Sequence, residues 1–322
     1  MEKLEAGQIK INPFRRWQKK AAPYIFISPF YIAFLIFGAF PIVFALYLSF
    51  NTWTGVAGTA IEFVGWENYY YTLTDPMFWD ALKTTILIGV YSGVPQHILA
   101  LFFAFILNLG FVKVKEFWKA TIFMPYITSA VAIALVFSVF YSHPNGFLNY
   151  IFVLLNNIPG LSSLLSWIGL DPPVNWLANT AWMRPAVSFT VVWMFTGWNT
   201  ILYLAGMQAI SHELYEAARV DGARWPQIFF RITLPCLKPM IQFAVIMTVI
   251  GQMQLFDQPL ILFGVHGGTG RAGYTIAMFL YQTAFNWNFF GSAASIAYVT
   301  FMFILIITLI TKRLLRSHEE VD

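Results

Sequence analysis

A small group of polar and indole side chains lies within long apolar stretches of the sequence, and these residues could contact a solute. The group comprises Trp193, Trp198, Asn199, Gln252, Gln254 and Asp257. Polar groups in apolar surroundings are costly, and they usually face an interior or a water-filled cavity. Amides and a carboxylate form hydrogen bonds and indole rings stack, so the group could guide a polar solute. The alternative is that each residue forms a hydrogen bond between neighbouring helices. The same two interpretations apply to Gln96 and His97, which also lie within an apolar stretch.

The segment from Ser211 to Pro239 has the pattern of two short helices joined by a sharp turn. Serine is favoured at the start of a helix, and Gly222 can adopt the positive φ of a tight turn. Pro226 suits the first turn of a second helix, and Pro235 is expected to end that helix. One face of the second helix carries Ile228, Phe229 and Ile232. An exposed apolar element of this kind is a candidate docking surface for a protein partner.

The composition places both groups of residues in a membrane protein. Hydrophobic residues make up 58% and charged residues 11% of the 322 residues, against roughly 45–50% and about 25% in soluble domains. A soluble protein could not cover so much apolar surface. The single cysteine, Cys236, excludes a disulfide-rich scaffold, and the sparse charge, +4 in total, argues against a nucleic-acid partner. We therefore predict an all-α polytopic protein embedded in a lipid bilayer.

Six apolar stretches are long enough to cross a hydrocarbon core, which takes roughly 20 helical residues. The predicted spans are Tyr24–Phe50, Leu82–Leu109, Ala120–Tyr141, Ala186–Ile210, Met240–Phe263 and Phe290–Ile310. Residues 142–184 are interrupted by Pro and Gly, which predicts short interfacial helices joined by turns on the outer side. A re-entrant or seventh span in that segment is the alternative.

The basic residues alternate between the segments that join these spans. All of the 19 Lys and Arg except Lys83, Arg184 and Arg271 fall in the two tails, the second-to-third loop or the fourth-to-fifth loop. The positive-inside rule then places both termini in the cytoplasm, which an even number of spans satisfies. The first apolar stretch is too long for a signal peptide and is expected to be retained.

The expected organisation has three parts. A basic cytoplasmic tail, 1–23, precedes a six-helix transmembrane domain, 24–313, and a cytoplasmic tail, 314–322, follows it. The transmembrane domain includes the external segment 142–184 and the cytoplasmic loop 211–239.

Three motifs stand at a fixed spacing within the cytoplasmic loop. They are Glu216-Ala217-Ala218, Asp221-Gly222-Ala223 and Ile232-Thr233-Leu234-Pro235, with Pro239 following. Together they resemble the EAA loop of permease subunits in binding-protein-dependent ABC importers. Nearly the whole chain resembles the carbohydrate-uptake branch, in particular its maltose-permease-like and glycerol-phosphate-permease-like first subunit. The turn Gly264–Gly270 departs from that branch, because it keeps paired glycines but lacks the proline that usually follows them.

The resemblance implies a division of labour among several chains in the bacterial cytoplasmic (inner) membrane. Two homologous permease subunits form one translocation path, two cytoplasmic ABC ATPase subunits dock on the EAA loops, and an extracytoplasmic solute-binding protein delivers the carbohydrate. By position, the ATPase-coupling residues would be Glu216, Ala217, Ala218, Asp221, Gly222, Ala223, Phe229, Ile232, Leu234 and Pro235. The six polar and indole residues of the spans would line this chain's half of the path.

The chain itself is then expected to bind no cofactor or metal and to catalyse no reaction. It contains no G-x-x-x-x-G-K-[ST] motif, so ATP and Mg²⁺ would be used by the partner ATPase subunits. The expected function is carbohydrate import by alternating access. An ion-coupled secondary carrier, with Asp257 or His97 as the coupling group, is the alternative, but it leaves the loop unexplained. A receptor or scaffold would fit the topology and carry no solute.

Overall fold

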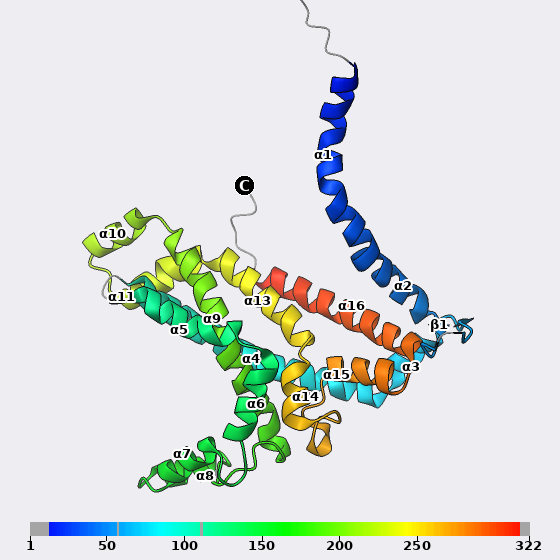
Figure 1. The fold of residues 1–322 in the computed structure, drawn as a ribbon. Coiled ribbons are helices and arrows are strands. Elements are labelled where there is room, and N and C mark those ends of the chain that lie inside the picture. Colours follow the sequence, from blue (N-terminus) through cyan, green and yellow to red (C-terminus); the bar gives the residue numbers. More distant parts are fainter. Residues whose placement is uncertain (1–12, 57, 110–111, 316–322) are drawn as a thin grey trace, which may run out of the picture.

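The computed structural model describes residues 13–56, 58–109 and 112–315, and it is built almost entirely of helices (Figure 1). For residues 13–20 it describes the backbone alone. Within these ranges, four helical stretches are long and apolar enough to cross a membrane: Ala21–Ser49, Pro76–Asn108, Thr180–Gln208 and Phe290–Leu314. Two bent helix pairs raise the number of candidate spans to six. The all-α membrane fold is confirmed, and the count of six spans stays a prediction.

The long elements are α1 (Pro13–Phe34), the π-helical turn η1 (Leu35–Ala39), α2 (Phe40–Ser49), α4 (Pro76–Asn108), α9 (Thr180–Gln208) and α16 (Phe290–Leu314). The short elements between them are β1 (Asn51–Thr52), β2 (Glu62–Phe63), α3 (Glu67–Thr74), η3 (Thr269–Arg271), α15 (Ile276–Tyr281) and η4 (Gln282–Asn286). The two strands pair antiparallel, with Asn51 opposite Phe63. The start of α4 follows from its sequence, because Asp75 accepts a hydrogen bond from the Met77 amide and Pro76 occupies the first turn.

The third span, expected over Ala120–Tyr141, consists of two helices. α5 (Lys115–Ile127) and α6 (Ala130–Phe140) meet at an angle of 94°. Thr128 and Ser129 between them are extended, with ψ of 147° and 131°. The Thr128 hydroxyl donates to the Met124 carbonyl, 3.1 Å away, and so satisfies one acceptor that the helix end leaves free. The sequence did not predict this break, and the pair of helices remains a candidate for a single, bent span.

The fifth span, expected over Met240–Phe263, is also broken. Three residues separate α13 (Lys238–Met253) from α14 (Asp257–Phe263). Leu255, in the break, is buried, and its carbonyl accepts a hydrogen bond from the Thr275 hydroxyl at 2.8 Å. A partner from the distant part of the chain therefore replaces the helical hydrogen bond that the break removes.

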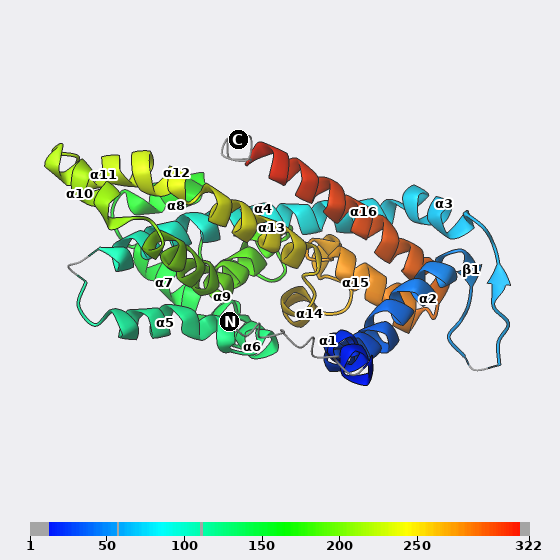
Figure 2. The same cartoon turned by 90° about the horizontal axis from the view of Figure 1, so that it is seen from above.

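The centre of the bundle is formed by α4 and α9, which pack along each other, with α5 against α9 and α13 against α4 and α16 (Figures 1 and 2). Ala100 and Ala104 of α4 are fully buried beside Tyr203 of α9. Small residues at such a contact let two helices approach closely, which is the usual device of helix packing in membranes.

The first helical arm, α1–η1–α2, diverges from this bundle (Figure 1). The most apolar stretch of this arm is only 11% buried. The exposed side chains of the arm include Phe26, Phe30 and Phe37. The arm touches the bundle near its end, where the Tyr298 hydroxyl donates to the Ile42 carbonyl at 2.6 Å. An apolar surface of this extent requires lipid or another protein to cover it.

The segment 142–184, which was expected on the outer side, contains two short helices, α7 (Phe147–Asn156) and α8 (Leu161–Trp167), as its Pro and Gly pattern predicted. The fully buried Asn149 joins α7 to the segments that precede α7 and follow α8. Its amide nitrogen donates to the carbonyls of Ser142 and Val174, and its oxygen accepts from the Val174 amide and the Trp176 indole. The location of these helices at a membrane surface stays a prediction.

We expect Asn149→Ala to destabilise the protein by about 2–4 kcal/mol, because it leaves several buried polar groups without partners. Thermal unfolding in detergent should then occur roughly 5–10 °C lower, a shift that scales with the entropy of unfolding. Asn157→Ala is the control, since Asn157 is exposed at the end of α7. Equal melting temperatures for the two variants would contradict the role of Asn149.

Candidate functional site

The loop 211–239 forms the two short helices and the turn that its sequence predicted. α10 (His212–Val220) starts at Ser211, whose hydroxyl accepts from the Glu213 amide at 3.3 Å. Gly222 has a φ of +76°, and open space surrounds the position of a missing Cβ. α11 (Trp225–Ile228) then begins the second helix.

The second helix is longer than expected. It continues from α11 through the π-helical turn η2 (Phe229–Thr233) into α12 (Leu234–Cys236), so Pro235 does not end it. Pro235 is the second residue of α12 and directly follows the π-helical turn and Leu234. The bend comes two residues after Pro235, at Leu237, where this helix and α13 meet at 70°. The extra residue of the π turn shifts the register of the helix, which is how it accommodates the proline.

The exposed surface of the loop is mixed apolar and charged. Of the predicted coupling residues, the exposed ones are Glu216, Ala217, Asp221, Gly222 and Pro235, and the half-buried ones are Ala218, Ala223, Phe229, Ile232 and Leu234. The sequence interpretation missed Val220, which is 87% exposed beside the turn, and Phe230, which is 65% exposed. The sequence pattern could have indicated both residues, because each lies on the outer side of a helix that the sequence predicts.

The base of the loop is fixed to the central helices. The Phe229 ring contacts Phe105 of α4, with centroids 4.8 Å apart. The buried Tyr215 hydroxyl shares a 3.2 Å hydrogen bond with Thr233, which joins α10 to η2. Leu237 is fully buried in the cluster that contains Tyr203 of α9. A force on the exposed tip would therefore reach α4 and α9 through packed side chains.

A second feature, the Trp198 pocket, lies between α4, α5, α9 and α13. Its volume is about 290 Å³, and its lining is Gln96, Tyr126, Phe195, Trp198, Asn199, Phe243, Met247, Thr248, Gly251, Gln252 and Leu255. Tyr126 and Trp198 form one wall, with ring centroids 4.9 Å apart and planes at 25°. Three of the predicted path residues, Trp198, Asn199 and Gln252, thus meet in one place.

Two amide oxygens of this pocket have no hydrogen-bond partner among the described residues. They are the Oε1 atoms of Gln96 and Gln252, whose side chains are 1% and 8% exposed. The Gln96 nitrogen donates to the Thr248 hydroxyl at 3.0 Å, which fixes that side chain across α4 and α13. A buried acceptor without a partner costs about 1–3 kcal/mol, so a donor on a solute would be bound favourably here.

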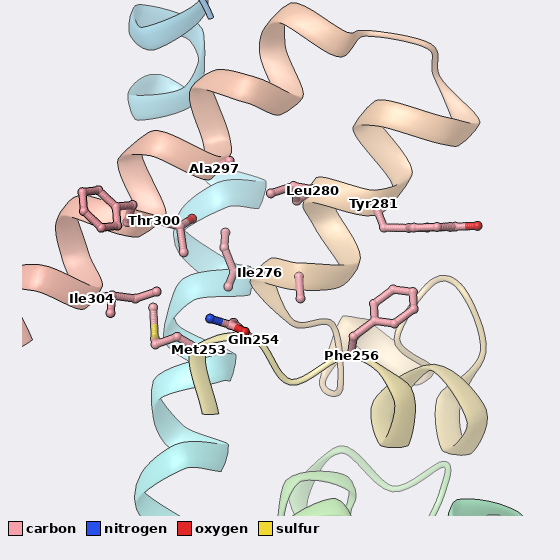
Figure 3. Close-up of a pocket in the computed structure, with 11 residues that line it drawn as sticks. Met253, Gln254, Phe256, Ile276, Leu280, Tyr281, Ala297, Thr300 and Ile304 are labelled. Atoms are coloured by element: carbon pink, nitrogen blue, oxygen red, sulfur yellow. The ribbon is translucent and has the colours of Figure 1, made fainter. Parts of the chain in front are cut away.

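The other predicted path residues lie outside this pocket. Trp193 is 48% exposed and contacts the Phe137 ring, 5.6 Å away. Gln254 lines a separate, largely apolar pocket between the end of α13 and α15–α16 (Figure 3). Asp257, expected within the fifth span, is exposed in the first turn of α14, where a carboxylate stabilises the helix N-terminus.

Gln96 and Tyr126 complete the pocket from α4 and α5, although neither was among the path residues predicted from the sequence. Gln96 is a polar residue within an apolar stretch, so the same signal that pointed to Gln252 applied to it. Tyr126 gave no such signal, because only the break between α5 and α6 reveals where α5 meets α9. Within the described ranges, no group of His, Cys, Asp or Glu could hold a metal ion.

The chain is similar to known proteins in both sequence and fold. The family model described as "Binding-protein-dependent transport system inner membrane component" matches residues 141–318. The probable ABC transporter permease protein YurN of Bacillus subtilis is 35% identical, over 94% of this chain and 99% of that protein. The arabinooligosaccharides transport system permease protein AraP of the same organism is 30% identical, over 94% and 91%.

A solved structure shares the fold. It is a bacterial alginate ABC transporter in complex with an alginate pentasaccharide-bound periplasmic protein. One of its chains superposes with a TM-score of 0.75 at 24% identity, over 94% of this chain and 96% of that chain.

Proposed function

The chain belongs to the family of binding-protein-dependent transport system inner membrane components, and from this premise we propose that it is a permease subunit of an ATP-driven carbohydrate importer. Such a subunit transports a solute and catalyses no reaction itself. The sugars in the names of similar proteins, arabinooligosaccharides and alginate, support carbohydrate as the class of solute.

The observation that carries the proposal is the connection between the loop and the Trp198 pocket. Phe229 and Leu237 anchor the loop on α4 and α9, and these two helices contribute Gln96 and Trp198 to the pocket. A docked ATPase that moves the loop would therefore move the walls of the pocket. This is the arrangement that alternating access requires, because ATP binding and hydrolysis must change which side the path opens to.

The coupling residues proposed on this loop are those predicted from the sequence, from Glu216 to Pro235, together with Val220 and Phe230. The exposed members of this set leave an apolar and charged surface for a partner to contact. The ATPase subunits would supply the ATP and Mg²⁺ chemistry, so this chain needs no nucleotide motif.

The arm α1–η1–α2 supports a second permease subunit as a further partner. A homologous subunit could cover the exposed apolar surface of this arm. The same subunit would complete the path, because the Trp198 pocket is formed by one chain and a path needs walls on all sides. We place the chain in the bacterial cytoplasmic membrane with both termini and the loop in the cytoplasm, and an extracytoplasmic binding protein at the opposite face. The domain boundaries proposed are 1–23, 24–313 and 314–322.

The proposal is tested by purification from native membranes in mild detergent and by uptake into vesicles. We expect an ABC ATPase and a second permease to co-purify, and uptake of a labelled sugar to require ATP inside the vesicle. Uptake should persist when an ionophore removes ion gradients. If the chain purifies alone and its transport stops with the ionophore but not without ATP, it is a secondary carrier and the proposal is wrong.

A further inference from the structure

We propose that a cavity beneath the loop 211–239 binds a phosphorylated sugar, which stabilises the loop against the central helices. This cavity, called here the Arg219 cavity, lies between α10, α11 and the ends of α4 and α9. α10 and α11 lie together at one end of the bundle (Figures 1 and 2). Among the described residues that line the cavity, none is a proposed coupling residue. The inference goes beyond the proposed function, because this ligand is neither the solute in its path nor the ATPase.

The cavity has the size and the mixed lining of a small-molecule site. Its volume is about 350 Å³, within the range of about 300–1,000 Å³ that ligand pockets span. Amide, imidazole and guanidinium groups come from three helices: Asn108 ends α4, Gln208 ends α9, and His212 and Arg219 belong to α10. A few polar groups that converge among apolar ones are the usual means of orienting a small ligand.

Arg219 is the group that binds the phosphate. Its guanidinium carbon lies 5.0 Å from the centroid of the Trp225 ring, and that ring contacts Phe105 of α4 with centroids 6.4 Å apart. Stacking orients the guanidinium and leaves its N–H donors free. Within the described part of the chain, the ion pairs are those of Lys119 with Glu116 and of His212 with Glu216, so Arg219 has no carboxylate partner there. A guanidinium fork matches two oxygens of a phosphate.

The charges around the cavity favour an anion. Glu216 precedes Arg219 by about one helical turn, but its carboxylate lies 3.1 Å from Nδ1 of His212 and does not line the cavity. No Asp or Glu is among the described lining residues, whereas Arg219 and His212 can both carry positive charge. A phosphate is therefore bound here in preference to a cation.

The part of the cavity formed by α4 and α9 suits hydroxyl groups. The side-chain amides of Asn108 and Gln208 can each donate and accept hydrogen bonds. Both helices end here, and the last carbonyls of a helix have no partner within it. Acceptors of this kind bind hydroxyl donors and repel a second anionic group. The cavity thus has a cationic side and an accepting side, which matches a sugar that carries one phosphate.

A ligand in this cavity would affect transport because it contacts both the loop and the bundle. Arg219 and Trp225 belong to the loop, and Asn108 and Gln208 belong to the central helices. A ligand that binds one arrangement more tightly than others increases the population of that arrangement. Since alternating access requires the importer to leave each arrangement in turn, the bound sugar phosphate is expected to slow ATP hydrolysis and import. This consequence rests on the proposed function, whereas the binding itself does not.

Equilibrium dialysis of labelled glucose 6-phosphate against the purified permease–ATPase complex, in phosphatidylcholine nanodiscs, tests the site. We expect saturable binding, and we expect glucose and inorganic phosphate to compete at least about tenfold more weakly, because each lacks one of the two kinds of contact. Absence of saturable binding would overturn the proposal. Equal competition by glucose would overturn the role of Arg219, and equal competition by inorganic phosphate would overturn that of Asn108 and Gln208.

A matched pair of arginine variants locates the binding. Arg219→Gln should weaken binding of glucose 6-phosphate at least about tenfold, because it removes the charged fork. Arg231→Gln makes the same change in the same loop, but Arg231 is exposed in η2 and does not line the cavity, so this variant should bind like the wild type. Asn108→Leu should weaken binding of glucose 6-phosphate and leave competition by inorganic phosphate unchanged. Equal loss in the two arginine variants would mean that the cavity is not the site.

A lipid headgroup could offer the same phosphate, and nanodiscs that contain phosphatidic acid distinguish the two sources. We expect them to leave the affinity for glucose 6-phosphate unchanged, because phosphatidic acid has no hydroxyl groups for Asn108 and Gln208. If phosphatidic acid lowers that affinity at least about tenfold, equivalent to about 1.4 kcal/mol, the lipid occupies the cavity and the sugar is not its ligand.

The rate of ATP hydrolysis separates this inference from the proposed function. We expect glucose 6-phosphate to slow hydrolysis by the wild-type complex and to have no effect on the Arg219→Gln complex. Binding without slower hydrolysis would overturn the effect on the loop. If an ATPase co-purifies and uptake needs ATP while nothing binds in the cavity, only this inference is wrong. If no ATPase co-purifies and uptake needs no ATP, the proposed function fails whatever the cavity binds.

Discussion

Gly222→Asp is expected to reduce the amount of ATPase that co-purifies with the chain by about tenfold or more, and ATP-driven uptake with it. Gly222 adopts a φ of +76°, a conformation that costs a side chain roughly 1 kcal/mol or more. The new carboxylate would also stand next to Asp221 on the exposed turn. Since tenfold in affinity corresponds to about 1.4 kcal/mol, strain and charge at a docking surface are together sufficient.

The loss should concern docking and not folding. No atom lies within 4 Å of the position of the added Cβ, so the variant should be as abundant in the membrane as the wild type. Gly58→Asp is the matched control, because Gly58 also has a positive φ, +89°, and open space, but it lies between the two strands. We measure the ratio of ATPase to permease after purification. If both variants lose the ATPase equally, the loop is not its docking surface.

The sequence was sufficient to predict the features that depend on neighbouring residues. Ser211 and Gly222 define the start and the turn of the loop through local hydrogen bonding and backbone freedom, and both were predicted correctly. The apolar stretches located the long helices for the same reason, since about 20 apolar residues are needed to cross a bilayer.

The features that the sequence did not predict depend on distant partners. The break after Met253 is stabilised by Thr275, and its consequence is that Gln254 and Asp257 leave the side of the helix that carries Gln252. The hydrophobicity of the residues around the break does not indicate that contact with Thr275. Tyr126 likewise enters the Trp198 pocket only because α5 stops at Ile127 and crosses α9 at that point.

The crossing of α5 and α9 yields the second large effect, because it depends on Gly197. A Cβ added at Gly197 would overlap the carbonyl oxygen of Ile122 and stand 3.0 Å from the Cα of Phe123. These are backbone atoms, so no side-chain rotation relieves the overlap. Gly197→Ala therefore has to separate α5 from α9, and overpacking of this kind typically costs about 1–3 kcal/mol.

We expect Gly197→Ala to lower the melting temperature in detergent by several degrees and to reduce ATP-driven uptake at least about tenfold. Separating the helices pulls Tyr126 of α5 away from Trp198 of α9, and the aromatic wall of the pocket is lost. Gly251→Ala is the control: Gly251 lines the same pocket from α13, and nothing lies within 4 Å of its added Cβ. Alanine is the better helix former by up to about 1 kcal/mol, so this variant should be as stable as the wild type or more stable. A stable, active Gly197→Ala protein would mean that α5 and α9 do not approach as closely as their backbones indicate, and the wall formed by Tyr126 and Trp198 would lose its structural basis.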